Sequence, residues 1–468
     1  MRTTTASTRA AAVALAAALG MANPLTAVAQ TGDATAKWAP PAVNMSYLPN
    51  DSGQPDKPYV KKTECVTHDQ TLSGVLRDRP WSQDYLQIDQ AQKLVQASTG
   101  GMGTGKKVAV IDTGVARHPY LKVQGGGDYV HPDNGLEDCD GHGTEVAGII
   151  AASTPTDIGF KGVAPDATIV SIRQTSQNYS VGDQSTVKQG SRQQGDGAGN
   201  LLTLAQAIVH AANLGGISVA NISIDNCRTA GGGISAQEKA LQAAIHYAVE
   251  KNIVIVAAAG NTSDACKQNE QADADSPQSI VTPPWFSDDV LSVAAIQEDG
   301  SVANFSMRGP WVSVAAPGTN ITSLDPSSSG LANQVVEGGK AGGIQGTSFA
   351  APYVAGLATL VRAQFPNLNA RQVMRRIEAT AQHPGAPGGH DQYIGYGVVD
   401  PIAALTAIVP AEEGLSSPPP KQLPSGLPPA TPRDWAPMIV ALAGTGGGLA
   451  VLLVTMFVVR TIRRNRRA

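Results

Sequence analysis

The stretch Gly346-Thr347-Ser348-Phe349-Ala350-Ala351-Pro352 places a serine between glycine-rich chain and a helix-forming run that ends near Phe365. Glycines at 342, 343 and 346 permit close backbone approach. A helix that starts here would direct its first N–H groups and its dipole at developing negative charge beside the serine. Taken alone, the stretch is also an ordinary turn of small residues that opens a buried helix. Ser348 therefore needs chemical partners elsewhere in the chain.

An acid and a base are available at two other element ends. The apolar run from Val108 to Ile111 is typical of a strand buried on both faces, and it ends in Asp112-Thr113-Gly114. Further on, Asp140-Gly141-His142-Gly143-Thr144 places a histidine between two glycines at the head of a helix. A histidine between an acid and a hydroxyl can take the serine proton and return it to the leaving group, while the acid fixes its tautomer.

A second strand end offers an amide. The predicted strand over residues 253–259 is followed by Gly260-Asn261, and the Asn261 side chain could donate to an oxyanion together with the backbone N–H of Ser348. Each of these motifs by itself is compatible with an ordinary turn. Their combination predicts an Asp112, His142 and Ser348 triad with Asn261 in the oxyanion hole.

Strands and helices alternate across residues 81–409, which predicts an α/β fold with a mainly parallel sheet and helices on both faces. We expect strands at residues 106–111, 168–172, 217–224, 253–259, 290–296 and 312–315. We expect helices at residues 81–97, 144–152, 201–214, 235–251, 348–365 and 369–380. Residues 176–200 are rich in Gln, Gly and Ser, which favours a flexible surface loop.

The segments around this domain predict an exported, membrane-anchored protein. Residues 1–29 have the pattern of a secretory signal peptide, and residues 30–80 that of an extension lying on the domain. A proline-rich linker at 410–437 precedes an apolar run at 438–459 that is long enough to span a bilayer. The arginine-rich tail at 460–468 places the C-terminus in the cytoplasm by the positive-inside rule and the domain outside.

The exported part is acidic. The net charge of −4 becomes −11 when the five tail arginines and the two arginines of the signal peptide are excluded, which argues against nucleic acid as a partner. All four cysteines lie in this part, where disulfides form. Of three possible pairings we expect Cys65–Cys139 and Cys227–Cys266, because the second pair brackets one helix-strand unit and the first would tie down the extension. A zinc site is the alternative, without C-x-x-C spacing to support it.

The motifs resemble a known family. V-I-D-T-G at 110–114, G-H-G-T at 141–144, A-A-G-N at 258–261 and G-T-S-F-A-A-P at 346–352 look like the subtilisin family of serine proteases, over roughly residues 81–407. The resemblance implies a subtilisin-like fold, with Asp112 as orienting acid, His142 as base, Ser348 as nucleophile and Asn261 as oxyanion donor. It gives no reason to expect a metal or other cofactor.

The order of segments narrows the resemblance to mycosins, the membrane-anchored proteases of actinobacterial type VII secretion systems. That resemblance implies an extension that wraps the domain and partners in the secretion membrane complex and among its exported proteins. The function that we expect is selective processing of those proteins, and the alternative is a mainly structural component of the complex. A degenerate pseudo-protease is disfavoured because all four catalytic positions are filled.

Two acidic features stay open. Where many subtilisins have glycines along the substrate cleft, this chain has Asp225-Asn226-Cys227, which predicts a narrower cleft. Asp225 would favour a basic substrate residue, or it is an exposed or hydrogen-bonded turn aspartate, and the sequence alone favours the second. Asp133, Glu137 and Asp138 could ligate calcium, but the sequence favours a solvated loop without a metal.

Overall fold

The computed structural model describes residues 38–67, 77–182, 197–270, 276–337, 340–414 and 436–466. The chain divides into two compact units, Met1–Val409 and Pro410–Ala468. The predicted signal peptide and most of the predicted linker lie outside the described residues.

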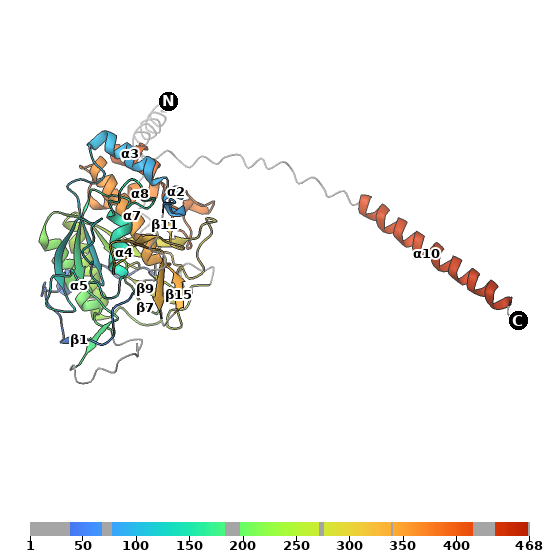
Figure 1. Cartoon of the computed structure of the whole chain (residues 1–468), viewed down its shortest axis with the longest axis horizontal. Helices are drawn as coiled ribbons and strands as arrows, with labels where there is room; N and C mark the ends of the chain where they lie inside the picture. The colour runs from blue at the N-terminus through green and yellow to red at the C-terminus, as the bar shows by residue number, and fades with distance from the viewer. Residues whose placement is uncertain are drawn as a thin grey trace, which may run out of the picture. The chain divides into compact units, whose positions relative to one another are not determined.

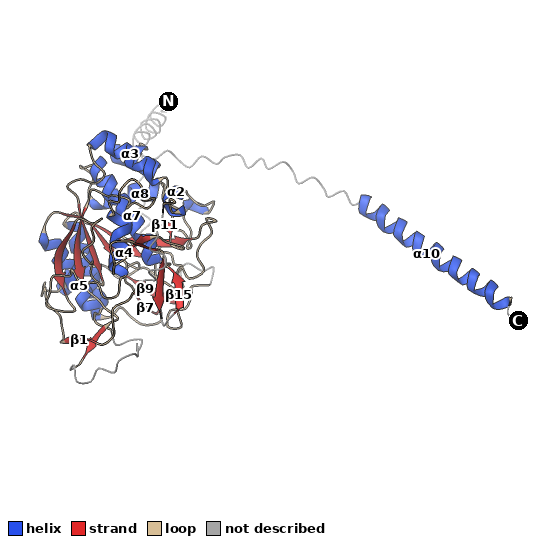
Figure 2. Ribbon diagram, in the orientation of Figure 1, coloured by secondary structure: helices blue, strands red, loops and turns tan. Residues whose placement is uncertain are grey.

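A seven-stranded parallel sheet forms the centre of the first unit (Figures 1 and 2). From edge to edge its strands are β11 (Val314–Pro317), β10 (Leu291–Ile296), β8 (Val254–Ala258), β6 (Ile217–Ile222), β2 (Lys107–Asp112), β4 (Thr168–Arg173) and β3 (Val123–Asp128). All residues of β8 and β10 are buried, as expected of apolar runs covered on both faces. The predicted α/β fold with a parallel sheet is confirmed.

Helices flank this sheet (Figure 2). The main ones are α4 (His142–Ala151), α5 (Leu201–Leu214), α6 (Ala236–Glu250), α7 (Thr347–Gln364) and α8 (Ala370–Ala379). α5 packs on α6, while α4 packs on α7, and α7 lies on four strands from β6 to β11. Capping boxes at Asn200, Ser235 and Asn369 fix where three helices begin, which explains why their predicted starts are accurate.

The structure differs from the predicted elements in several places. The helix expected at 81–97 is broken at Gln87, whose φ is 51°, into α2 (Trp81–Tyr85) and α3 (Ile88–Thr99). The strand expected at 217–224 ends at Ile222. Elements without a prediction are β3, α9 (Pro401–Thr406) and the strand pairs β7 (Asn226–Thr229) with β9 (Ser279–Thr282), β12 (Ser323–Leu324) with β13 (Leu331–Ala332), and β14 (Gln334–Glu337) with β15 (Lys340–Gly343).

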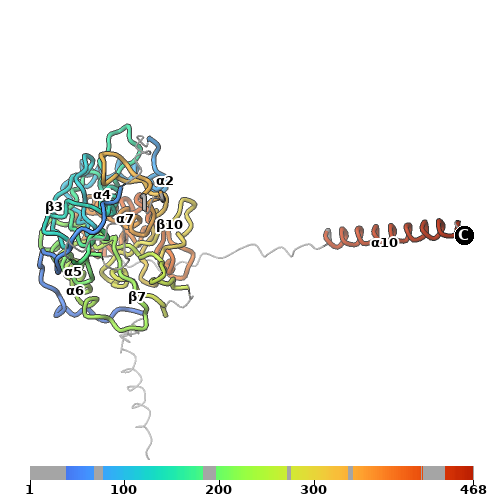
Figure 3. The backbone as a smooth tube through the Cα atoms, turned by 60° about the horizontal axis from the view of Figure 1, so that its bottom comes forward, coloured from blue at the N-terminus to red at the C-terminus, as the bar shows by residue number. Residues whose placement is uncertain are grey.

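Residues 38–67 lie along the domain, and in Figure 3 their blue trace passes beside α6. Strand β1 (Tyr59–Lys61) pairs antiparallel with β5 (Tyr179–Val181), and the Trp285 indole donates to the carbonyl of Trp38 at 2.6 Å. The prediction of a flexible loop over 176–200 is therefore wrong for β5, because pairing with the extension orders it. Residues 183–196 of that loop lie outside the described residues.

The second unit contains a short 3-10 helix, η5 (Pro410–Glu413), and the long helix α10 (Ala436–Asn465). Met438–Asn465 is 28 residues long and apolar enough to cross a membrane. At 1.5 Å per residue this stretch rises about 42 Å, which exceeds a hydrocarbon core of roughly 30 Å. It is the one such helix among the described residues.

Candidate active site

The first two candidate side chains meet between β2 and α4. Asp112 is the last residue of β2 and is fully buried, while His142 is the first residue of α4 and its side chain is 27% exposed. The imidazole Nδ1 lies 2.7 Å from Asp112 Oδ1. The carboxylate is therefore placed to hold the imidazole in one orientation, with the other ring nitrogen free to act on a substrate-side proton.

Glycines allow this approach. A β-carbon on Gly143 would lie 2.0 Å from the carbonyl oxygen of Gly114 and 3.2 Å from the Asp112 Cβ. Gly141, which caps α4, has φ 83°, a left-handed value that favours glycine. The glycines on both sides of His142 thus permit close backbone packing, as their place in the sequence predicts.

The electrostatics of the pair favour a charged imidazole. Burial works against the imidazolium, but the neighbouring Asp112 charge and its hydrogen bond outweigh it and raise the pKa of His142 above the ordinary value of 6.5. The same interactions would stabilise the imidazolium if His142 acted as a general base.

Asp138 ties the two segments together, a role that the sequence did not reveal. One of its oxygens accepts from Thr113 Oγ1 and Gly141 N, both at 2.8 Å. The other accepts from the amide and hydroxyl of Thr144 at 2.8 and 2.6 Å. The expectation of a solvated acidic loop is therefore wrong at Asp138, whereas Glu137 lies 2.9 Å from Arg173 but keeps a side chain that is 40% exposed.

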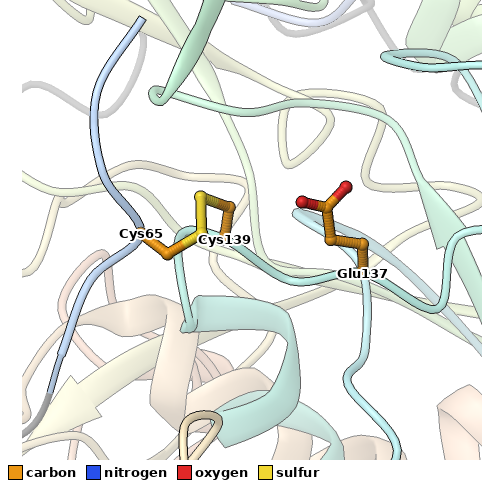
Figure 4. A group of neighbouring side chains, drawn as sticks. All are labelled: Cys65, Glu137 and Cys139. Atoms are coloured by element: carbon orange, nitrogen blue, oxygen red, sulfur yellow. A yellow bond between two sulfur atoms is a disulfide. The ribbon is translucent and has the colours of Figure 1, made fainter. Parts of the chain in front are cut away.

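The loop ahead of His142 is also fixed covalently. Cys139 forms a disulfide with Cys65 of the extension, and Cys227 forms one with Cys266, as expected. Cys65, Glu137 and Cys139 lie close enough to share an ion (Figure 4), but the two sulfurs are bonded to each other and offer no thiolate. The cluster links the extension to the candidate site and gives no support to a zinc site.

Ser348 and Asn261 face each other across Gly346. Ser348 is the second residue of α7 and is 9% exposed. A β-carbon on Gly346, whose φ is 150°, would lie 2.9 Å from Ser348 Oγ and 3.7 Å from Asn261 Nδ2. The amide and hydroxyl of Thr347 donate to Asn261 Oδ1 at 3.0 and 3.1 Å, which turns the NH₂ group of Asn261 toward the serine side.

Other contacts bring these two pairs into one site. Ser223 Oγ, just past the end of β6, donates to the carbonyl of Ser348 at 2.7 Å. The His142 ring lies 5.0 Å from the ring of Phe349, the residue after the serine. His142 and Phe349 also line a cavity of about 450 Å³ with Asp140, Glu145 and residues 341–345. The four predicted side chains thus come from four separate element ends, and one of them, His142, lines this cavity.

Comparison with known proteins identifies the family. Residues 103–397 match the model of the subtilase family. Mycosin-1 of Mycolicibacterium smegmatis is 41% identical over 456 residues, which cover 92% of this chain and 95% of that protein. The chain belongs to the mycosins, within the subtilase family. Mycosin-1 of Mycobacterium tuberculosis is 44% identical over 385 residues, or 79% of this mycosin and 83% of the relative.

Solved mycosin structures agree with this assignment. The crystal structure of MycP1 from the ESX-1 type VII secretion system has 42% sequence identity and a TM-score of 0.70, and covers 79% of this chain and 97% of its own. A chain of the intact ESX-5 inner membrane complex has 40% identity and a TM-score of 0.71, and covers 89% of this chain and 99% of its own. This mycosin is a serine endopeptidase.

Proposed function

We propose that Asp112, His142 and Ser348 form the catalytic triad of this endopeptidase, with Asn261 as oxyanion donor. The observation that carries the proposal is the 2.7 Å contact from the buried Asp112 carboxylate to His142. It is supported by the shared orientation of Ser348 Oγ and Asn261 Nδ2 around Gly346.

In this mechanism Ser348 Oγ attacks the carbonyl carbon of a peptide bond while His142 takes its proton. The carbonyl oxygen becomes negative and accepts from Asn261 Nδ2 and the Ser348 backbone N–H. The C–N bond then breaks as His142 gives the proton to the leaving amine, which leaves an ester on Ser348. Water, activated by His142, hydrolyses that ester and restores the serine.

We propose further that the substrates are a few proteins exported by a type VII secretion system. This proposal is supported by a related chain that belongs to the ESX-5 inner membrane complex. Residues 1–29 act as signal peptide, 30–80 as extension, 81–409 as protease domain, 410–437 as linker, 438–459 as membrane span and 460–468 as cytoplasmic tail. The domain then works outside the cytoplasm, tethered close to the membrane.

Labelling with a fluorophosphonate probe tests the triad. We expect the full-length protein, purified in detergent, to be labelled at Ser348, and Ser348→Ala and His142→Ala to abolish labelling. Labelling that survives in Ser348→Ala, or that fails in the wild type, would contradict the proposal and revive the pseudo-protease hypothesis.

A second candidate function is structural support of the secretion complex, which the ESX-5 assembly of a related chain favours. Complementation of a deletion strain with Ser348→Ala separates the two. Secretion restored by the inactive protein would make catalysis dispensable for export. Comparison of the N-termini of exported proteins between the wild-type and Ser348→Ala strains would then show whether substrates are processed.

A further inference from the structure

Asp225 lies close in the fold to the segments that carry two of the proposed catalytic groups. It follows Ser223 and Ile224 beyond the end of β6, and Ser223 is hydrogen-bonded to the carbonyl of Ser348. A β-carbon on Gly260 would lie 3.2 Å from Asp225 Oδ2. Because Gly260 directly precedes Asn261, the carboxylate lies beside the strand that carries the proposed oxyanion donor.

The Asp225 carboxylate has no counter-charge within the part of the chain that the structure describes. Among the described residues, it has neither a hydrogen bond nor an ion pair with another group. The nearest cation along the chain, Arg228, is engaged with Glu238 at 2.5 Å. Asp225 also lines a cavity of about 160 Å³ whose other walls are uncharged, among them Gln174, Asn200 and Leu204.

The Asp225 carboxylate is partly desolvated. The residue keeps solvent-exposed surface, yet the protein around it desolvates the carboxylate and raises its pKa to about 6. Because Asp225 is exposed, solvent screens part of the cost of this unpaired charge, and an asparagine of nearly the same shape would avoid the rest. An unpaired carboxylate beside the strand end that carries the proposed oxyanion donor is available to a charged ligand.

We propose that Asp225 is a specificity-determining residue that selects a lysine or arginine side chain on the residue whose carbonyl Ser348 attacks. This inference rests on the proposed catalytic roles of Ser348 and Asn261. A carbonyl held between these two groups places its own side chain along Gly260, where it meets the carboxylate. Both cationic side chains would supply the missing counter-charge, and arginine could bind both oxygens.

Two matched peptidyl phosphonate probes test this proposal on the full-length protein in detergent. One probe carries an aminobutyl side chain at the reacting residue and the other an n-butyl side chain, with the same flanking sequence. We expect the amine probe to label Ser348 about ten- to a hundredfold faster, the range for a hydrogen bond to a charged group. In Asp225→Asn the ratio of the two rates should fall close to one, and in Asp225→Glu it should stay well above one.

Controls separate this inference from the proposed triad. Asp299→Asn removes the same charge from an exposed turn and should leave the ratio unchanged. If the two phosphonate probes label the wild type at equal rates, or if their rate ratio is unchanged in Asp225→Asn, the inference is overturned. Labelling by the small fluorophosphonate would still support the triad in either case. Fastest labelling by a third probe with a methyl side chain would also overturn the inference, because Asp225 and Val281 would then merely fill the space beside Gly260. Failure of the fluorophosphonate itself would refute the triad.

Discussion

The substitution Gly143→Ala tests the close packing between the segment that carries Asp112 and the helix that carries His142. Gly143 is the second residue of α4, where alanine is intrinsically better than glycine by about 1 kcal/mol. Helix propensity alone therefore predicts a more stable protein. The packing predicts the opposite, because the added methyl would lie 2.0 Å from the carbonyl oxygen of Gly114, a backbone atom that cannot swing aside.

Relief of that overlap requires the two segments to separate by more than 1 Å, since ordinary contacts begin near 3.4 Å. Overpacking of this kind costs about 1–3 kcal/mol, which exceeds the gain in helix propensity. The 2.7 Å bond between His142 and Asp112 would lengthen by a similar amount, and a misplacement of about 1 Å lowers catalytic rates about a hundredfold.

We would measure unfolding in urea and the rate of fluorophosphonate labelling, with Gly233→Ala as control. A β-carbon on Gly233 meets nothing within 4 Å, so this variant should match the wild type in both measurements. A Gly143→Ala protein that is as stable as the wild type and is labelled within about threefold of its rate would refute the packing argument.

Three other perturbations follow from the same contacts. Asp112 raises the pKa of His142, so the neutral base forms only above that pKa, and the labelling rate should rise with pH through a midpoint above 6.5. In Asp112→Asn this midpoint should move to lower pH. An unmoved midpoint would contradict the argument. Because the pKa of Asp225 is raised, the folded protein loses stability as pH rises from 3.8 through about 6 and the carboxylate becomes charged. Asp225→Asn should therefore raise Tm at pH 8 but not at pH 3.5. An equal rise in Tm at both pH values would show that the charge of Asp225 is not the reason. Replacing both Cys65 and Cys139 with serine should lower the free energy of unfolding in urea by about 4 kcal/mol, since 74 residues separate them, and a loss below 1 kcal/mol would show that the extension is held by other contacts.

The sequence predicts well those elements whose signals are local. Helix α5 begins and ends where expected because Asn200 caps its start and Gly215 follows its end. The strands that precede Asp112 and Gly260 are continuous apolar runs, so their carboxyl ends are readable. By contrast, β3 contains three consecutive glycines and no apolar period, and it is a strand because β4 pairs with it at the sheet edge.

Side-chain environments depend on contacts that no local pattern carries. Asp138 looks like one acid among several in a polar loop, and only the fold brings Thr113 to it from 25 residues away. The same limit applies to Asp225, whose neighbours Gly260 and Val281 come from two other parts of the chain. From the sequence alone Asp225 is best interpreted as a turn aspartate, because the sequence does not show whether a cation lies beside its carboxylate.

The need for glycine explains why some residues of the candidate site can be predicted from the sequence and others cannot. The proposed catalytic motifs stand out because they need glycine: Gly143 packs against the backbone of Gly114, and Gly346 lies beside the side chains of Ser348 and Asn261. A larger residue at these glycine positions would collide with its neighbours. Glycine is therefore required there, which makes the motifs easy to recognise in the sequence. Asp225 lies where the chain leaves room for a substrate, and many side chains fit such a place. Its identity therefore reflects the ligand rather than the fold, which is why a change there should alter what is cleaved and leave the structure standing.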